Sequence, residues 1–299
     1  MTKEFGLVGL GKMGANMARR MAEQGWRVVG QNRTFQVAKD LEKEGVTPVE
    51  TLADLVAALP APRTVWLMLP AGAPTAEAVA ALADLLAPGD VVVDGGNSRY
   101  TDDVPNAARL AAKGIRYLDC GTSGGPGGAR TGACLMVGGD RAAFEAVRPL
   151  FTDFARKDGV QFFDGAGAGH FVKMVHNGIE YGMMQAIAEG FALMKTAPFN
   201  LDLSRVADIY QHGSVIESRL VGWMQTAFAA HGQNMEGVTP VIAHTGEGMW
   251  TVEAGKEMGV PMPVIEASLQ FRKDSVVNPS YTGQLVSALR GQFGGHATK

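Results

Sequence analysis

The segment Phe5-Gly6-Leu7-Val8-Gly9-Leu10-Gly11-Lys12-Met13-Gly14 decides the fold of the first half of this chain. An apolar run predicts a buried strand, and the residues after it match the pattern G-x-G-x-x-G where a helical pattern begins. In this context the glycines allow a tight turn, a close approach of the backbone to a pyrophosphate, and close packing of helix on strand. The segment predicts dinucleotide binding, and the alternative is a plain glycine-rich turn. The residues expected to hold the coenzyme are Gly9, Leu10, Gly11, Lys12, Met13 and Gly14.

Short apolar runs alternate with helical patterns through the first half of the chain, which predicts βαβ units and an α/β fold. We expect a doubly wound, mostly parallel sheet of the Rossmann type. The predicted strands are residues 5–10, 27–30, 64–69, 91–94, 116–120, 133–137 and 160–163, with helices such as 14–24 and 73–86 between them. After residue 165 only helical patterns remain. We therefore expect a dinucleotide-binding Rossmann domain at 1–165 and an all-α domain for substrate binding and oligomerisation at 166–299.

The end of the second predicted strand favours NADP over NAD as coenzyme. An NAD site usually places an acidic residue there to bind the ribose hydroxyl, whereas this chain has Asn32, Arg33 and Thr34. Arg33 could neutralise a 2′-phosphate, and the other two side chains could donate hydrogen bonds to it. The alternative is a single exposed arginine in a loop.

Charge and composition exclude several classes of partner. The chain has 299 residues, a net charge of −3 and no long run of Lys or Arg, which argues against nucleic acid or an anionic membrane. We see no signal peptide and no apolar run that could cross a bilayer, so we expect a cytoplasmic protein. The histidines and cysteines have no metal-ligand spacing, so we expect no metal and two buried free thiols, Cys120 and Cys134.

Two glycine-rich segments follow predicted strands and are candidates for ligand binding. Asn97 could exchange hydrogen bonds with a hydroxylated substrate or with the coenzyme, or simply form a turn. Ser123, Gly124 and Gly125 could bind a carboxylate through backbone N–H groups and the hydroxyl. The second segment looks like the nucleophile loop of a trypsin-like protease, but that fold needs a histidine upstream of the serine, and the first histidine here is His170.

A polar stripe marks the first helix of the second half. Lys173, His176, Asn177, Glu180 and Tyr181 fall at i, i+3, i+4, i+7 and i+8, which places them on one face of one helix. The flanking positions are apolar, so we expect the helix to be buried. A buried lysine and glutamate must be paired, hydrated or used. The structural alternatives are a buried ion-pair network or a solvated face.

Together these segments resemble the short form of decarboxylating 6-phosphogluconate dehydrogenases, in the β-hydroxyacid dehydrogenase superfamily, over the full length of the chain. The most specific matches are the stripe helix, residues 170–182, and the tail Phe293-Gly294-Gly295-His296. The resemblance implies oxidation and decarboxylation of 6-phosphogluconate to ribulose 5-phosphate and CO2, with hydride transfer to NADP or NAD and no metal.

The resemblance also implies a role for individual residues. Lys173 would be the general base at the C3 hydroxyl, and Glu180 would be the general acid that protonates C1. The carboxylate and hydroxyls of the substrate would be held by Asn97, Ser123, Gly124, Gly125, His176, Asn177 and Tyr181. The phosphate would be bound by Arg272, Arg290 and His296, because Met249 replaces a phosphate-binding lysine of the long form.

The resemblance further implies a homodimer or homotetramer. The C-terminal tail, turning at Gly294 and Gly295, would complete the site of the neighbouring subunit, and the alternative is a frayed terminus. Two other functions compete with the main one. One is a dehydrogenase of another β-hydroxy acid such as 3-hydroxyisobutyrate, which has no need of the basic tail. The other is a catalytically silent NADP-binding sensor, which has no need of both Lys173 and Glu180.

Overall fold

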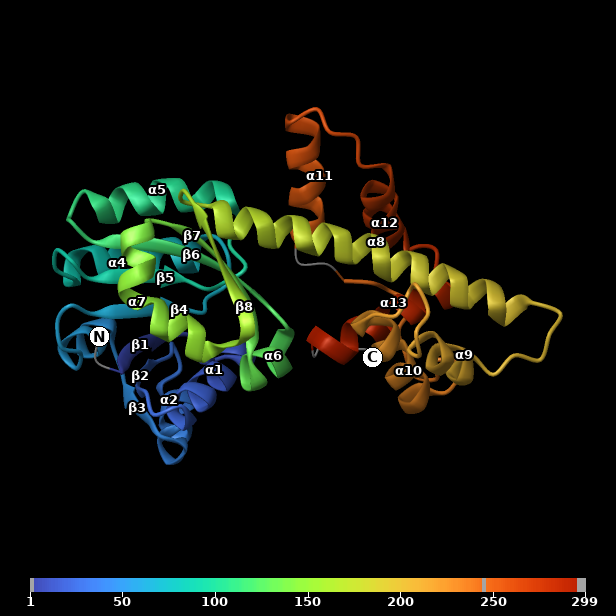
Figure 1. The fold of residues 1–299 in the computed structure, drawn as a ribbon, viewed down its shortest axis with the longest axis horizontal. Helices are drawn as coiled ribbons and strands as arrows, with labels where there is room; N and C mark the ends of the chain where they lie inside the picture. The colour runs from blue at the N-terminus through green and yellow to red at the C-terminus, as the bar shows by residue number, and fades with distance from the viewer. Residues whose placement is uncertain (1–2, 244–245, 295–299) are drawn as a thin grey trace. The chain divides into compact units, whose positions relative to one another are not determined.

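The structure, a computed structural model, describes residues 3–243 and 246–294. It separates into two compact units, Met1–Met174 and Val175–Lys299. The division falls inside one long helix, α8 (Ala168–Thr196), which therefore contributes residues to both units (Figure 1). The domain boundary expected at residue 165 lies just before this helix begins.

The first unit is built on one eight-stranded sheet with the order β3-β2-β1-β4-β5-β6-β7-β8. All neighbouring strands run parallel except β6 and β7, which are antiparallel. The doubly wound, mostly parallel sheet predicted from the sequence is confirmed. The strands are β1 (Glu4–Val8), β2 (Arg27–Gln31), β3 (Val46–Val49), β4 (Thr64–Leu67), β5 (Val91–Asp94), β6 (Arg116–Ser123), β7 (Ala133–Gly139) and β8 (Ala155–Asp164).

One strand of the sheet was not predicted. β3 is only four residues long, contains Pro48 and pairs with β2 alone, because it lies at the edge of the sheet. Proline is tolerated on an edge strand, where one side of the backbone needs no partner. Such a strand has no long apolar run, so its sequence lacks the pattern by which a strand is predicted.

Helices cover both faces of the sheet. They are α1 (Lys12–Glu23), α2 (Phe35–Asp40), α3 (Leu52–Ala57), α4 (Ala73–Leu85), α5 (Tyr100–Ala111), α6 (Gly125–Thr131) and α7 (Arg141–Phe154), with a 3-10 turn at Glu42–Glu44. Successive side chains of a strand point to opposite faces. Leu7 and Trp66 pack with α1 and α7 in one apolar layer, and Val8 and Val65 pack with α3 and α4 in the other. Burial of both faces explains the continuous apolar runs of the central strands.

The strand register brings the glycine-rich segments to one edge of the sheet. Val8 of β1 lies opposite Leu67, Leu67 lies opposite Asp94, and Asp94 lies opposite Asp119. The strands in this series run parallel, so the segments that follow them leave the sheet at the same edge. In open α/β sheets, ligands bind at this carboxyl edge.

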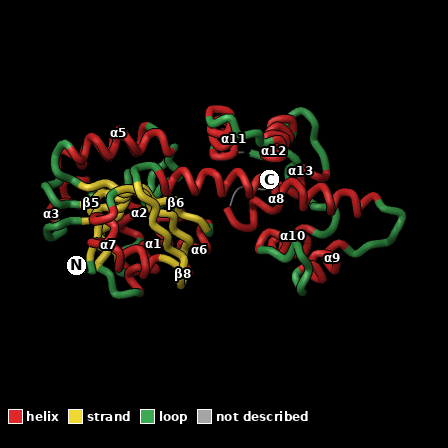
Figure 2. Tube along the Cα trace, turned by 45° about the horizontal axis from the view of Figure 1, so that its top comes forward, coloured by secondary structure: helices red, strands yellow, loops and turns green. Residues whose placement is uncertain are grey.

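The second unit contains helices and no strand among its described residues (Figure 2). Besides the end of α8 they are α9 (Leu203–Tyr210), α10 (Arg219–His231), α11 (Glu247–Glu257), α12 (Pro263–Asp274) and α13 (Tyr281–Gly294). The larger apolar core joins α8, α9, α10 and α13. A smaller core joins α8, α11 and α12 through Tyr181, Val252 and Leu269. None of the described helices has the length and apolar character to cross a membrane.

Two expectations about local environment are wrong, and a third falls partly outside the described residues. The stripe helix α8 is not buried all round, because Ile179 is 53% and Met183 is 43% exposed. Gly294 is the last residue of α13, and Gly295, with which it was expected to form a turn, lies outside the described residues. Cys120 is buried, but Cys134 is exposed, because it occupies the outward position of β7 between buried neighbours.

Candidate active site

The first glycine-rich loop has the geometry of a phosphate-binding turn. Gly9 has φ +91°, a conformation that favours glycine, and a Cβ on Gly14 would meet the Gly9 carbonyl oxygen. A Cβ on Gly11, by contrast, would meet nothing within 4 Å. Helix α1 begins directly afterwards, with no side-chain cap and no acidic residue in its first turn. Open backbone at a helix N-terminus suits an anion, so this loop fits a pyrophosphate.

The segment after β2 contacts the loop of residues 9–14 and exposes two side chains that a ligand could reach. The Asn32 carboxamide oxygen accepts from the backbone N–H of Leu10 at 3.0 Å, and its nitrogen donates to the Thr34 carbonyl at 3.1 Å. Asn32 therefore holds the glycine loop against the end of β2. Arg33 and the side chain of Thr34 are exposed at this edge.

Lys173 lies against the carboxyl edge of the same sheet. It is only 8% exposed, and a Cβ on Gly121 of β6 would collide with its Cβ and Cγ atoms. The absence of a side chain at Gly121 thus makes room for the lysine stem. Nearby, Asn97 is exposed in the loop after β5, and Ser123 ends β6. Gly124 and Gly125 follow with φ +118° and +61°, at the start of the short helix α6.

Asp119 of β6 fixes the start of α8. One of its carboxylate oxygens accepts from the Gly167 backbone N–H and the other from the His170 backbone N–H, both at 2.8 Å. A carboxylate at this position accepts hydrogen bonds from the unpaired N-terminal amides. It also interacts favourably with the positive end of the helix dipole. A Cβ on Gly169 would meet the backbone of β7 at Met136 and Gly138, so helix and sheet approach closely here.

A buried cluster that the sequence did not predict joins this helix end to the loop after β5. It consists of Asp94, Asp103, Tyr117 and His170. His170 Nδ1 lies 2.8 Å from an Asp103 carboxylate oxygen, and the Tyr117 hydroxyl donates to the other oxygen at 2.7 Å. The Tyr117 hydroxyl also lies 3.4 Å from Asp94. Its members are far apart in sequence, and no short motif marks them.

The protonation equilibria of the buried cluster are shifted by burial and by mutual charge. Burial raises the pKa of Asp103 to about 6, although the hydrogen bond with His170 opposes this. Burial disfavours a charged His170, but the hydrogen bond to Asp103 and the surrounding carboxylates outweigh it and raise the pKa to about 9. At neutral pH the pair is therefore an imidazolium and a carboxylate.

In the second unit, the polar stripe of α8 continues with three further residues. His176 Nδ1 lies 2.9 Å from the Asn177 carboxamide oxygen and 3.9 Å from a carboxylate oxygen of Glu180. The side chains of His176 and Glu180 are 39% and 22% exposed, so both are accessible to a ligand. The structure therefore brings these three predicted site residues together on one face of α8.

Two buried arginines meet the same helix from α12 and α13. Arg272 is 2% exposed, and its guanidinium carbon lies 3.4 Å from the centre of the Tyr181 ring. Burial lowers the pKa of Arg272 to about 10 and also lowers that of Arg290, while Tyr181 and Glu180 oppose the shift in both. No ion pair with a carboxylate is formed by either arginine within residues 3–243 and 246–294. A buried cation of this kind favours an anionic ligand.

Glu247 lies with Tyr181, Arg272 and Arg290 in the second unit, and it was not among the site residues predicted from the sequence. It is 4% exposed at the start of α11, and its charge acts on Tyr181, Arg272 and Arg290. Its position between Gly246 and Gly248 was the available signal. Met249 packs beside the small core of α8, α11 and α12. His296 lies outside the described residues.

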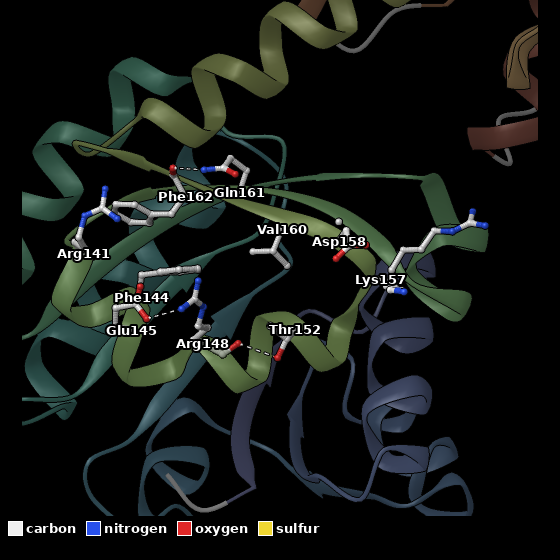
Figure 3. Close-up of a pocket in the computed structure, with 12 residues that line it drawn as sticks. Arg141, Phe144, Glu145, Arg148, Thr152, Lys157, Asp158, Val160, Gln161 and Phe162 are labelled. Atoms are coloured by element: carbon white, nitrogen blue, oxygen red, sulfur yellow. Dashed lines mark hydrogen bonds and ion pairs between the residues drawn. The ribbon is translucent and has the colours of Figure 1, made fainter.

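A separate hollow of about 370 Å³ lies between α7 and β8 (Figure 3). Arginines line it, but Arg141 pairs with Asp164 and lies over the Phe162 ring, and Arg148 pairs with Glu145. None of the predicted site residues lines this hollow. Two of its arginines are paired within the protein and it lies apart from the predicted site residues, so it is a poor candidate for the active site.

Each of the two units matches a known protein family. Residues 4–165 match the model for the NAD binding domain of 6-phosphogluconate dehydrogenase, and residues 169–276 and 195–299 match the model for its C-terminal domain. A putative 6-phosphogluconate dehydrogenase of Bacillus subtilis is 42% identical over 99% of this chain and 99% of its own length. An NAD(+)-dependent, decarboxylating 6-phosphogluconate dehydrogenase of Haloferax volcanii is 40% identical over 98% of this chain and 97% of its own length.

Solved structures give the same grouping. A Plasmodium falciparum 6-phosphogluconate dehydrogenase, solved with NADP+ and with 6-phosphogluconate, matches with a TM-score of 0.83 and 29% identity, over 92% of this chain and 62% of that one. A 3-hydroxyisobutyrate dehydrogenase of Mycobacterium tuberculosis matches with a TM-score of 0.77 over 97% of this chain and 100% of that one, but at 22% identity it shows the fold alone. By its sequence and by both of its units, the chain belongs to the 6-phosphogluconate dehydrogenase family.

Proposed function

We propose that this protein oxidises and decarboxylates 6-phosphogluconate to ribulose 5-phosphate and CO2, with hydride transfer to NADP or NAD. The observation that carries the proposal is the pair of buried arginines, Arg272 and Arg290, beside Tyr181 on the stripe helix. Two buried cations on a polar helix face suit a phosphorylated acid better than a short unphosphorylated one.

The reaction needs a base first and an acid last. The loop of residues 9–14 would hold NAD(P), which would supply the hydride acceptor. Lys173 takes the proton of the C3 hydroxyl as the C3 hydrogen leaves as hydride, which gives a β-keto acid. The C1–C2 bond of the substrate then breaks and CO2 leaves; the electrons of that bond form the C2=C3 bond, while protonated Lys173 returns its proton to the C3 oxygen, which gives an enediol. Glu180 then donates a proton to C2, which is C1 of the product, and Lys173 again removes the C3 hydroxyl proton, which gives the ketone of ribulose 5-phosphate. A lysine that acts as a general base must be neutral when the substrate arrives.

The spacing of these two groups on α8 suits their different tasks. They are seven residues apart, and a helix rises about 1.5 Å per residue, so about 10 Å separates them along the axis. Such a distance allows the base and the acid to act on different carbons of one sugar acid. Asn97, Ser123, Gly124, Gly125, His176 and Asn177 would orient its carboxylate and hydroxyls.

The finer coenzyme preference is also a proposal. Arg33 and Thr34 are exposed after β2, where an NAD site usually has an acidic residue. We therefore expect NADP to be used more efficiently than NAD. Both coenzymes and the phosphorylated substrate are cytoplasmic metabolites, so we place the enzyme in the cytoplasm.

A homo-oligomer is the expected assembly, either a dimer or a tetramer. The exposed apolar side chains Ile179 and Met183 of α8 support a contact with a second subunit. Arg290 itself is buried in α13 within its own chain, so only the segment 295–299, with His296, remains to reach a neighbouring site.

Substrate choice tests the proposed function directly. NAD(P)H formation and CO2 release are measured with 6-phosphogluconate, gluconate and 3-hydroxyisobutyrate. Arg272→Met should raise KM for 6-phosphogluconate by about tenfold or more, because the loss of a charged hydrogen bond costs about 1.5–3 kcal/mol, with little effect on coenzyme binding. Arg219→Met is the matched control, since Arg219 also lies over an aromatic ring in the second unit but is exposed. Faster turnover of 3-hydroxyisobutyrate, or no turnover at all, would contradict the proposal.

A further inference from the structure

The buried cluster of Asp94, Asp103, Tyr117 and His170 has no part in the roles assigned above, yet it touches two of the segments that carry them. At one end, Asp94 accepts from the Gly96 backbone N–H at 3.0 Å and from the Ser98 hydroxyl at 2.6 Å. These two bonds lie on either side of Asn97. They fix the loop that presents this side chain.

At the other end, His170 stands three residues before Lys173 on α8. Side chains at i and i+3 share one face of a helix, so the orientation of His170 and that of Lys173 are linked through the first turns of α8. The backbone N–H of His170 is held by Asp119, and the stem of Lys173 lies against Gly121. This end of the cluster therefore fixes the helix that presents the lysine.

The middle of the cluster connects the two ends. Asp103 in the first turn of α5 binds both His170 and the Tyr117 hydroxyl, and Tyr117 reaches Asp94. Tyr117 is 4% exposed, and Asp94 and Asp103 are fully buried. Buried hydrogen bonds of this kind are costly to break, because no water replaces the lost partner.

We propose that His170, Asp103 and Tyr117 are positioning residues that hold Lys173 and Asn97 in one fixed geometry. This inference rests on the proposed function, because it concerns the placement of residues in that active site. Asp94, Asp103 and His170 also bring possible metal-ligand atoms within 4.8 Å of one another. Protein donors from Ser98, Tyr117 and His170 already face the carboxylates, so a hydrogen-bonded chain accounts for the arrangement.

The least disruptive test is Tyr117→Phe, which removes the central hydroxyl and keeps the ring. We expect kcat to fall by about tenfold or more, because small displacements of catalytic groups are costly. The dissociation constant of the coenzyme should stay within about twofold, because the loop of residues 9–14, which would hold it, follows another strand, β1. Tyr100→Phe is the matched control, since this tyrosine of α5 lies outside the cluster and packs on Phe171.

A second pair of variants separates positioning from a general loss of stability. Asp103→Leu removes both acceptors and should lower kcat further than Tyr117→Phe. Asp103→Asn should recover most of the loss, because its amide can accept from Tyr117 and donate to a neutral His170. If both Asp103 variants reduce activity only in proportion to the fraction of folded protein, the cluster is merely structural and the inference is wrong.

Hydrogen–deuterium exchange supplies a readout that does not depend on the substrate. In Tyr117→Phe, the amides of residues 95–99 and 168–174 should exchange faster together, while Tyr100→Phe should match the wild type. Unchanged exchange in both segments, or a change in only one of them, would overturn the inference. An inactive wild-type protein would refute the proposed function, and the exchange result would still decide whether the two segments are coupled.

Discussion

The charge of the buried His170 should leave a measurable mark on stability as the pH changes. Its pKa in the folded protein is about 9, against 6.5 for an ordinary histidine. A group whose pKa rises on folding stabilises the protein fully below its unfolded pKa, and this stabilisation is lost as the pH rises through the folded pKa. One pKa unit corresponds to about 1.4 kcal/mol, so about 3 kcal/mol of stability should disappear between about pH 6.5 and pH 9.

The substitution His170→Asn isolates this effect. Asparagine keeps an N–H donor for Asp103 and cannot be protonated, whereas Asp94, Asp119 and Tyr117 remain the same. The free energy of unfolding is measured with urea at several values between about pH 6 and about pH 9.5. The wild-type value should fall by about 3 kcal/mol more than the variant value over this range.

The ionisation of Asp103 contributes to this comparison, because burial raises its pKa to about 6 while the hydrogen bond and charge of His170 lower it. The wild-type curve is therefore also compared with that of the double variant His170→Asn/Asp103→Asn, which lacks both titrating groups, and the same difference of about 3 kcal/mol is expected. The control His212→Asn replaces an exposed histidine of the second unit and should leave the wild-type curve unchanged. Parallel curves for wild type and His170→Asn would refute the reasoning, as would a histidine NMR signal for His170 that titrates near its ordinary pKa.

Three further predictions concern catalysis, coenzyme and assembly. Lys173→Ala should lower kcat by about 10²–10⁴-fold, the usual contribution of a general base, and steady-state kinetics within threefold of wild type would exclude this role. Arg33→Ala should raise KM for NADP by about tenfold and barely change KM for NAD, because one charge-assisted bond to a phosphate is worth about 1.5–3 kcal/mol; a wild-type enzyme that prefers NAD tenfold would contradict it. Removal of residues 295–299 should inactivate the enzyme without unfolding α13, and mixing with Lys173→Ala subunits should restore part of the activity. If mixed oligomers form and stay inactive, the tail does not act in the neighbouring site.

The parts of the fold that could be predicted are those in which burial forces a simple pattern. β1, β4 and β5 lie inside the sheet with helices on both faces, so their sequences are continuous apolar runs. β3 escaped prediction because an edge strand with Pro48 needs neither an apolar run nor a full set of hydrogen bonds.

The candidate site, too, has some features that the sequence could predict and others that it could not. The placement of Lys173 and Glu180 on one helix was predictable because a helix repeats every 3.6 residues, which makes a stripe visible in the sequence. The buried cluster was not, because Asp94, Asp103 and His170 lie on separate elements and meet only through the strand order of the sheet. Exposure was also hard to foresee, since the sequence does not distinguish an exposed apolar residue such as Ile179 from a buried one.

The exposed thiol of Cys134 offers a reporter of ligand binding. Cys134 lies directly opposite Ser123 in the antiparallel pair of β6 and β7, so their side chains share one face of the sheet about 5 Å apart. Burial raises the pKa of Cys120 well above its ordinary value, which makes that thiol unreactive. A thiol-reactive fluorophore should therefore label this chain at a single position without any engineering. Its emission would respond when an anion occupies the neighbouring loop, before any chemistry takes place.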